Sequence, residues 1–431
     1  MAYVSRRSLL RFLGAATVAG GGVTAAASPA CAAHPAPRTG DNPVVRENLA
    51  TGSDAWAVGH RETSGVTCRA PEIQGYASAT SVAPGSSLGF HLASHRDQTC
   101  TVSVYRVGHY AGAGARHLLT GEPIPVGPGD APAVSRRTGA VACDWPVSWT
   151  LDVPSDWVSG IFLAVFTTED GFRSFTPFVV REESRRSDVL VVLPFTGYQA
   201  DNVWPLPPGP VPGDGPLQVS FDRPYAGLGL PAGLVQDAAL ARWVEEAGYD
   251  VTYASALDLH EGRVDPARCT AVVLSGREAH WSREMRDGLT AAVGAGTRLA
   301  LLDADGAPGR VRLAPSADGR PSRVLTRRPV GLGAGTGIRL ARRTAPGAGS
   351  WPWQGGIDGS RPAGTGHGVR VDEDGHGRLV LRAGAVSGGP AWALALGEPE
   401  HLDAAVGSAT GKLFDRMVGE RPRGSGATLP V

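Results

Sequence analysis

The sequence predicts an N-terminal β-sandwich followed by a doubly wound α/β domain. From about residue 52 to residue 182, short runs of alternating polarity are separated by proline and glycine turns, as in antiparallel sandwiches. From residue 187 onwards, continuous apolar runs alternate with segments of helical period, which is typical of a parallel sheet covered by helices. The chain of 431 residues is long enough for two or more domains of roughly 100–200 residues each.

Three runs in the first half have the two-residue period of half-buried strands. They begin at Ser87, Cys100 and Ser159. The turn signals between such runs include Pro84-Gly85 and the segment from Gly112 to Gly114, because proline fixes φ and glycine permits positive φ. No segment of helical period interrupts this half, so we expect the sandwich to occupy residues 52–182.

The second half contains the elements of an α/β domain over residues 187–418. The buried strands that we expect cover residues 188–194, 250–255, 270–274 and 298–303. A helix over residues 237–248 should have Asp237 as N-cap and Gly248 as C-cap. A second helix should begin at the N-cap Ser282.

The remainder of this half is less regular. Residues from about 307 to 390 are rich in Gly, Pro and Arg, which predicts an insertion of strands and loops. The apolar run 391–396 and a helix from about 401 to 418 are expected to complete the sheet. We expect the tail, residues 419–431, to be mobile.

The N-terminus has the pattern of a twin-arginine export signal. Arg6 and Arg7 stand in a serine-led polar segment and are followed by a weakly apolar run over residues 12–27. This run is too short and too rich in Gly and Ala to remain as a membrane span. Small residues around Cys31 indicate cleavage after residue 32, so we expect an exported protein without a membrane segment. An ordinary secretory signal, and a lipoprotein with Cys31 as the lipid-bearing residue, are the alternatives.

The amino-acid composition restricts the classes of partner that we expect this chain to bind. The 41 basic and 41 acidic residues give a formal net charge of 0, so no basic surface argues for nucleic acid or anionic lipid. A small-molecule ligand is the partner that we expect, and the oligomeric state stays open. Residues 33–51, which begin with a proline-rich stretch, are expected to be a flexible linker.

An exported chain can form disulfides. Cys100 and Cys143 both lie in the β-rich half and are the pair that we expect to be bridged, with a link to Cys68 as the alternative. Cys269 opens an apolar run and is expected to be a small buried hydrophobic residue.

Ligands of an open α/β sheet bind beyond the carboxyl ends of its strands. Three segments should meet there: Phe195–Trp204, Ser220–Tyr225 and Ser275–Ser282. No Gly-x-Ser-x-Gly elbow is present, which argues against serine hydrolase chemistry. His109-Tyr110 is expected to be a turn, and Asp372–Asp374 a solvated loop.

Six motifs carry a resemblance to a known family. They are Gln74–Gly85, Tyr105–Arg116, Trp157–Gly160, Pro177–Arg181, Phe221–Tyr225 and Gly248–Tyr253. In this order they resemble the large (beta) subunit of N,N-dimethylformamidase and its secreted bacterial relatives, over most of residues 42–312. The resemblance implies a β-sandwich before an α/β domain resembling glutamine amidotransferases. It also implies a site in which two tyrosines and a glutamate hold one iron.

The family's ligand set is altered in this sequence. Its Trp-Gln-Ala-Tyr-Asn segment corresponds to Tyr198–Asn202, which puts Asp201 where a ligand tyrosine stands. Arg-Pro-Tyr is retained, so Tyr225 would be the other tyrosine. The glutamate of Gly-His-x-Glu-Tyr-Trp is replaced by Ala279. One ligand of three therefore survives.

Two interpretations stay open for the residues expected beyond the carboxyl ends of the parallel strands. Asp201, Tyr225 and His280 could form a rebuilt metal site, or they could be capping and packing residues. The candidate residues are Tyr198, Asp201, Asn202, Arg223, Tyr225, Glu278, His280, Trp281 and Asp305. Iron is one cofactor option, and we favour no cofactor. The function is correspondingly either metal-assisted hydrolysis of a small amide or related C–N bond, or non-catalytic binding through the altered cleft or the sandwich.

Overall fold

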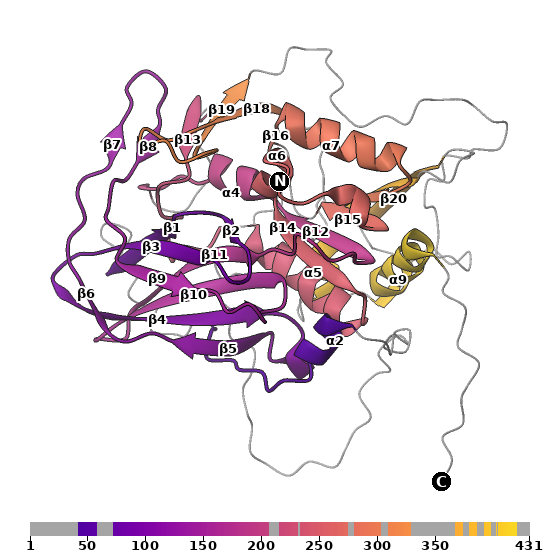
Figure 1. The fold of residues 1–431 in the computed structure, drawn as a ribbon, viewed down its shortest axis with the longest axis horizontal. Coiled ribbons are helices and arrows are strands. Elements are labelled where there is room, and N and C mark those ends of the chain that lie inside the picture. The colour runs from indigo at the N-terminus through magenta and orange to yellow at the C-terminus, as the bar shows by residue number, and fades with distance from the viewer. Residues whose placement is uncertain are drawn as a thin grey trace, which may run out of the picture.

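The structure, a computed structural model, consists of β-sheets stacked beside a helix-covered parallel sheet (Figure 1). It describes residues 42–57, 72–206, 215–231, 233–274, 280–302, 309–328, 367–373, 379–385, 392–397, 402 and 404–419. The expected signal peptide, Cys68, Glu278, Asp305 and all of the expected tail except Gly419 lie outside these residues. No helix within the described residues is long and apolar enough to cross a membrane.

Two sheets in the N-terminal half pack face to face, and we call them the N-terminal sheet pair. One contains β1 (Ile73–Ala77), β3 (Ser87–Ser94) and β9 (Trp149–Asp152). The other contains β2 (Ser81–Val82), β11 (Arg173–Val180), β10 (Gly160–Thr168), β4 (Gln98–Val107), β5 (Ala115–Thr120) and β6 (Ile124–Val126). The Phe90 ring of the first sheet meets the rings of Phe166 and Phe178 of the second at centroid distances of 5.9 and 5.8 Å.

The second half is built around a six-stranded sheet. Its order is β14 (Val251–Ser255), β12 (Val189–Leu193), β15 (Ala271–Leu274), β17 (Arg298–Leu302), β21 (Leu379–Ala385) and β20 (His367–Glu373). The first five strands are parallel and β20 is antiparallel. The four strands predicted from the apolar runs are confirmed, within one residue at each end.

Helices cover both faces of this sheet. Val191 and Leu193 point into a core that contains α5 (Leu234–Glu246), α8 (Trp392–Gly397) and α9 (Ala404–Val418). Leu190 and Val192 point into a second core with α6 (Ala256–His260) and α7 (Arg283–Gly294). Alternate residues of one strand therefore face opposite layers, which is why the predicted runs are continuously apolar.

The strand order contains a reversal that positions the site. Along the chain the parallel strands come as β12, β14, β15, β17 and β21, but in space β14 lies on one side of β12 and β15 on the other. Connections from β12 and β15 thus leave the sheet in opposite directions, and such a reversal point is where open α/β sheets bind their ligands.

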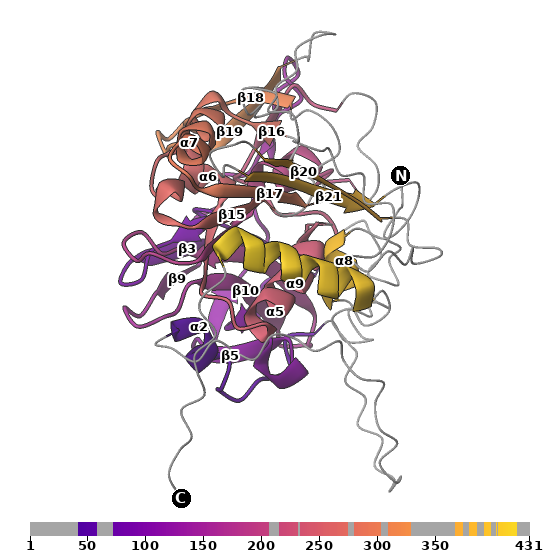
Figure 2. The same ribbon diagram turned by 90° about the vertical axis from the view of Figure 1, so that its right-hand side faces the viewer.

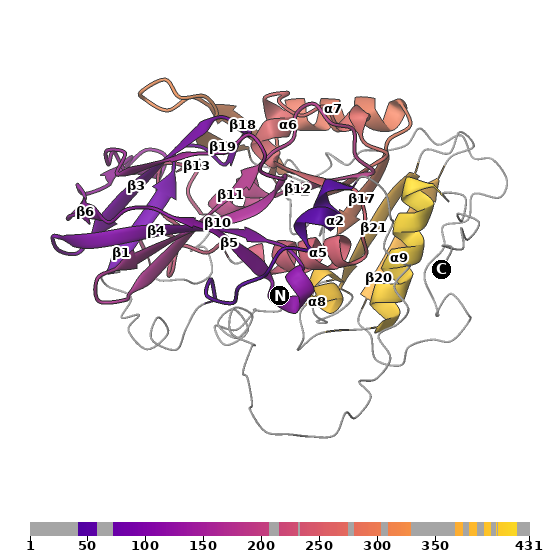
Figure 3. The same cartoon turned by 60° about the horizontal axis from the view of Figure 1, so that its bottom comes forward.

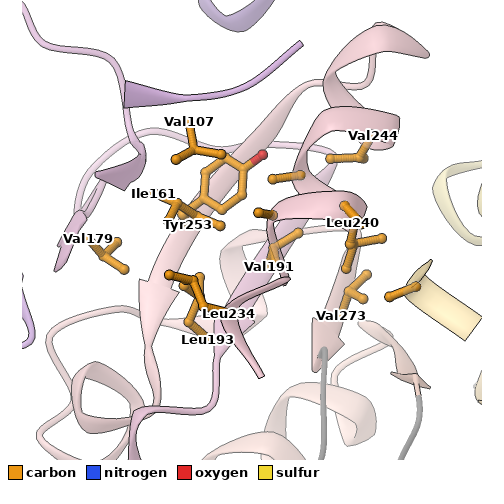
Figure 4. Close-up of a cluster of buried hydrophobic side chains, with 14 of the residues drawn as sticks. Val107, Ile161, Val179, Val191, Leu193, Leu234, Leu240, Val244, Tyr253 and Val273 are labelled. Carbon is orange, nitrogen blue, oxygen red and sulfur yellow. The ribbon is translucent and has the colours of Figure 1, made fainter. Parts of the chain in front are cut away.

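The N-terminal sheet pair lies beside the α/β part (Figure 3). One continuous core of buried side chains joins the two (Figure 4). Val107, Ile161 and Val179 of β4, β10 and β11 belong to the same cluster as Val191 of β12 and Tyr253 of β14. All are at most 2% exposed. Strand β14 would otherwise be a bare sheet edge, and the sheet pair covers it.

A small sheet and a hairpin complete the described fold. The sheet contains β13 (Gln218–Ser220), β19 (Val324–Arg328), β18 (Gly309–Ala314) and β16 (His280–Trp281), and the hairpin joins β7 (Ala133–Val134) to β8 (Val141–Ala142). Figure 2 shows β16, β18 and β19 beyond the parallel sheet, beside α6 and α7. Strands β18 to β21 fall within the insertion expected at about 307–390.

Several predicted boundaries are corrected. Helix α5 begins after Gly233, and Asp237 lies inside its first turn instead of capping it. Gly248, with φ of 74°, directly follows the C-cap Ala247. The run 391–396 lies largely in helix α8, while β21 supplies the additional parallel strand.

Part of the expected linker, and the first two residues of an expected loop, lie in a helix and a strand. Residues 43–47 form helix α2 (Pro43–Glu47), whose Asn42 cap accepts a hydrogen bond from the backbone N–H of Val44. Val44 is fully buried. Asp372 and Glu373 end strand β20 instead of forming a solvated loop.

The predicted disulfide between Cys100 and Cys143 is wrong. Cys100 lies in the core between the two N-terminal sheets, whereas Cys143 lies in a separate cluster with Trp145 and Trp204. Both are free, and burial raises the pKa of each thiol to about 12. Cys269 is buried among apolar side chains, as predicted.

Candidate functional site

The candidate site lies at the carboxyl ends of β12 and β15. Helix α4 (Phe195–Ala200) starts directly beyond β12 and forms the first part of the segment Phe195–Trp204. Strand β16 follows β15 after residues 275–279, which lie outside the described residues, and α4 packs against it. Within the described residues, the first of the three predicted segments is therefore in contact with the end of the third at this edge of the sheet.

Three polar side chains at this edge form what we call the edge group: Asp201, His280 and Arg327. Asp201 is the exposed C-cap residue of α4, and the Arg327 guanidinium of β19 donates to the carbonyl oxygen of Ala200. Burial lowers the pKa of His280 to about 4, with Asp201 opposing this shift and Arg327 adding to it. The imidazole is therefore neutral near pH 7 and can accept a proton or a hydrogen bond.

Gln199 is the centre of a second, buried network that the sequence analysis missed. Its Oε1 accepts hydrogen bonds from Arg223 Nε (3.2 Å) and from Asn202 Nδ2 (3.0 Å). Arg223 also donates to the backbone oxygens of Ser220, Trp204, Gln199 and Asn202, at 3.0 to 3.2 Å. Gln199 and Arg223 are each 2% exposed. The network holds the end of α4 against the segment that carries Tyr225.

Tyr225 is held as a neutral phenol. It is 7% exposed, and its ring stands edge-on to that of Tyr198 at 6.4 Å. Burial raises the pKa of Tyr225, an effect that is opposed by the charges of Arg323 and Arg223 and by a hydrogen bond from Gln199. Tyr198 in turn donates its hydroxyl proton to the buried carboxylate of Asp237 on α5.

The other described candidates have structural contacts. Asn202 accepts hydrogen bonds from the backbone N–H groups of Trp204 and Ala226, and donates to Pro224 O at 2.8 Å. Trp281 is buried in the core with α7. Of the predicted candidates, Asp201 and His280 are brought together, while Asn202 and Arg223 stabilise the surrounding loops. Glu278 and Asp305 cannot be placed, because they lie outside the described residues.

Sequence patterns contain a weak signal for the missed residues. Gln199 lies inside the Tyr198–Asn202 motif, between the candidate site residues Tyr198 and Asp201. Arg327 lies in the arginine-rich stretch that was predicted only as an insertion. Across the described residues, no three His, Cys, Asp or Glu side chains gather closely enough to hold a metal ion.

Comparison with known proteins identifies the family. Residues 101–424 match the family described as N,N-dimethylformamidase beta subunit-like, C-terminal. The chain belongs to this family. The match extends from β4 to beyond α9, so it includes the edge group and the Gln199 network. It does not by itself assign an activity to this dimethylformamidase-like chain.

Comparisons with individual proteins do not add to what the family match shows. No curated protein matches the chain. Among solved structures, the superoxide reductase (neelaredoxin) of Ignicoccus hospitalis is similar over 28% of this chain and 86% of its own, at 8% identity and a TM-score of 0.17. A cycloisomaltooligosaccharide glucanotransferase of Paenibacillus sp., solved with cycloisomaltoheptaose, is similar over 58% of this chain and 46% of its own, at 9% identity and a TM-score of 0.20. Neither similarity is strong enough to support a conclusion about fold or function.

Proposed function

We propose that this dimethylformamidase-like chain is an exported protein that binds a small amide or a related C–N compound at the edge group, without the iron chemistry of the enzyme. The observation that carries this proposal is the neutral imidazole of His280 beside Asp201 and Arg327, at the reversal point of the parallel sheet. Crevices at such points are where open α/β sheets bind their ligands.

The edge group matches the hydrogen-bonding pattern of an amide. Arg327 has only donors, the Asp201 carboxylate has only acceptors, and neutral His280 has one ring nitrogen available as an acceptor. An amide oxygen accepts from the guanidinium, and an amide N–H donates to Asp201 or His280.

The residues present do not fit an iron centre of the family type. Tyr225, the one retained ligand, is flanked by the guanidinium groups of Arg323 and Arg223, whose charges repel a cation. A phenol ionises near neutral pH only beside a strong cation, and burial here raises its pKa further. With Asp201 and Ala279 at the two other ligand positions, the site lacks two of the three family ligands.

One observation favours a second candidate, metal-independent hydrolysis. A histidine with a pKa of about 4 is unprotonated at neutral pH, as a general base must be. His280 could then activate a water molecule while Arg327 stabilises the developing oxyanion. The resemblance of the α/β part to glutamine amidotransferases, which also cleave a C–N bond, belongs to the same proposal.

The experiment combines metal analysis with ligand titration, using the mature protein purified from its native host. We expect far less than one iron per chain and little hydrolysis of N,N-dimethylformamide. Formamide and acetamide should shift the His280 imidazole resonance in NMR spectra. In calorimetric titrations with the same two amides, Asp201→Asn and His280→Gln should abolish binding, while His117→Gln, at an exposed position on β5, should leave it unchanged.

Two outcomes would contradict the proposal. The first is about one iron per chain with a tyrosinate-to-iron absorption band that disappears in Tyr225→Phe, which would restore the enzyme's chemistry. The second is the absence of any amide-dependent shift at His280. Iron binding created by Ala279→Glu together with Asp201→Tyr would show instead that the native site is an altered form of the family site.

A further inference from the structure

Arg223 is a buried cation without an acidic partner. It is 2% exposed, and its hydrogen bonds all go to neutral oxygens: the side-chain amide of Gln199 and four backbone carbonyl groups. Within the described part of the chain, no carboxylate lies at ion-pair distance from it. Removing an arginine from water is costly unless its charge is compensated.

The other fully buried arginines of the described residues are compensated. Arg106 is paired with Glu245 at 2.8 Å, and Arg323 with Asp222 at 2.7 Å. Each of these pairs fastens one structural element to another. Arg223 is thus as deeply buried as Arg106 and Arg323 but, unlike them, is not paired with a carboxylate in the described part of the chain.

Arg223 also acts on the edge group. Its pKa is lowered to about 10, mainly by burial and in part by the charge of Arg327, so the two guanidinium groups are near enough to repel each other. Both remain charged at neutral pH. Both also hold the end of α4, because Arg223 donates to Gln199 O and Arg327 to Ala200 O.

We infer that the ligand of the edge group carries a carboxylate in addition to its amide or related C–N group. This inference rests on the proposed function. The carboxylate would take the place of the amide oxygen at Arg327, which is only partly buried. The amide N–H would still donate to Asp201 or His280, and Arg223 would favour the carboxylate through its charge. Since the donors of Arg223 are already engaged, Arg223 is a positioning residue and does not bind the ligand directly.

The test compares two nearly isosteric probes, succinamate and succinamide, at constant ionic strength. Each has a primary amide at one end, and they differ in whether the other end is charged. We expect wild-type protein to bind succinamate at least about tenfold more tightly than succinamide, measured by calorimetry and by the His280 NMR shift. This preference should fall to about threefold or less in Arg223→Gln and Arg327→Gln, and persist in Arg223→Lys, which keeps the charge.

The matched control is Arg310→Gln, because Arg310 is an exposed arginine of β18 outside the edge group. It should keep the full preference for succinamate. If Arg223→Gln fails to fold, the wild-type comparison and Arg327→Gln still decide the matter.

The outcomes separate the two proposals. Equal affinity of the wild type for both probes, or an unchanged preference in folded Arg223→Gln, would overturn the inference and leave amide binding intact. If neither probe shifts the His280 resonance, the proposed amide binding is wrong, and so is the inference that the ligand carries a carboxylate.

Discussion

Arg106 of β4 and Glu245 of α5 form an ion pair with 2.8 Å between Nη2 and Oε1, and their side chains are 1% and 0% exposed. Glu245 also accepts hydrogen bonds from the Tyr253 hydroxyl (2.9 Å) and from Asn48 Nδ2 (2.8 Å). Arg106 donates to Ser159 O at 2.8 Å. The pair therefore ties the N-terminal sheet pair to the α/β part, in a motif that the sequence analysis used only as a mark of family.

We expect the loss of either partner to destabilise the whole protein. Arg106→Met or Glu245→Gln would leave a buried group without its counter-charge, at a cost of about 3–5 kcal/mol in the free energy of unfolding. Urea denaturation measures this. The control is Arg283→Gln, which breaks the exposed pair with Asp287 and should cost under about 0.5 kcal/mol. Similar losses in the buried and the exposed variants would contradict the role assigned to the pair.

Two glycines make room for this ion pair. A Cβ at Gly160 would lie 2.7 Å from Arg106 Nε, and one at Gly108 would lie 2.4 Å from Glu245 Oε2. We expect Gly160→Ala and Gly108→Ala each to lower stability by about 1–3 kcal/mol through overpacking. Gly288→Ala in α7, where a Cβ meets nothing within 4 Å, should instead stabilise by up to about 1 kcal/mol. Thermal unfolding of the three variants checks the opposite signs.

The parallel strands could be predicted because a strand that is buried on both faces consists of a continuous run of apolar residues. Val189–Leu193 is apolar throughout, since each residue faces a helix layer. The start of α5 could not be predicted in this way. Asp237 has the composition of an N-cap, but its carboxylate is taken up by the Tyr198 hydroxyl, a contact that only the tertiary structure creates. Asp237 and the three residues before it then belong to the helix.

The sequence points to Asp201 and His280 because they are ionisable residues in the segments that follow β12 and β15. Gln199 could not be predicted, because a neutral amide has no distinctive pattern, and its importance lies in contacts with Asn202 and Arg223. The disulfide prediction failed because shared membership of a β-rich region does not fix which layer a cysteine faces. Cys100 points into the core between the sheets, and Cys143 lies in another cluster.

Export is the expectation that rests on the sequence alone. Replacing Arg6 and Arg7 by lysine should leave the precursor in the cytoplasm, because the twin-arginine route requires the arginine pair. Fractionation of cells that express the precursor, followed by immunoblotting, measures this. The matched control replaces Arg11, which lies outside the pair, by lysine and should not alter export. Normal export of the double variant would indicate an ordinary secretory signal instead.

The edge group predicts a specific pH dependence for His280. Its folded-state pKa of about 4 lies below the ordinary value of 6.5, so the folded protein binds fewer protons than the unfolded chain between these values. His280 therefore lowers stability progressively as the pH falls from 6.5 towards 4, and has no such effect above that range.

Asp201→Asn should lower the pKa of His280 further, because a negative charge is lost, whereas Arg327→Gln should raise it. NMR titration of the imidazole carbon shifts measures these changes, with the exposed His117 as internal reference. A wild-type His280 that titrates near 6.5, unaffected by either substitution, would mean that the three side chains do not act as one group.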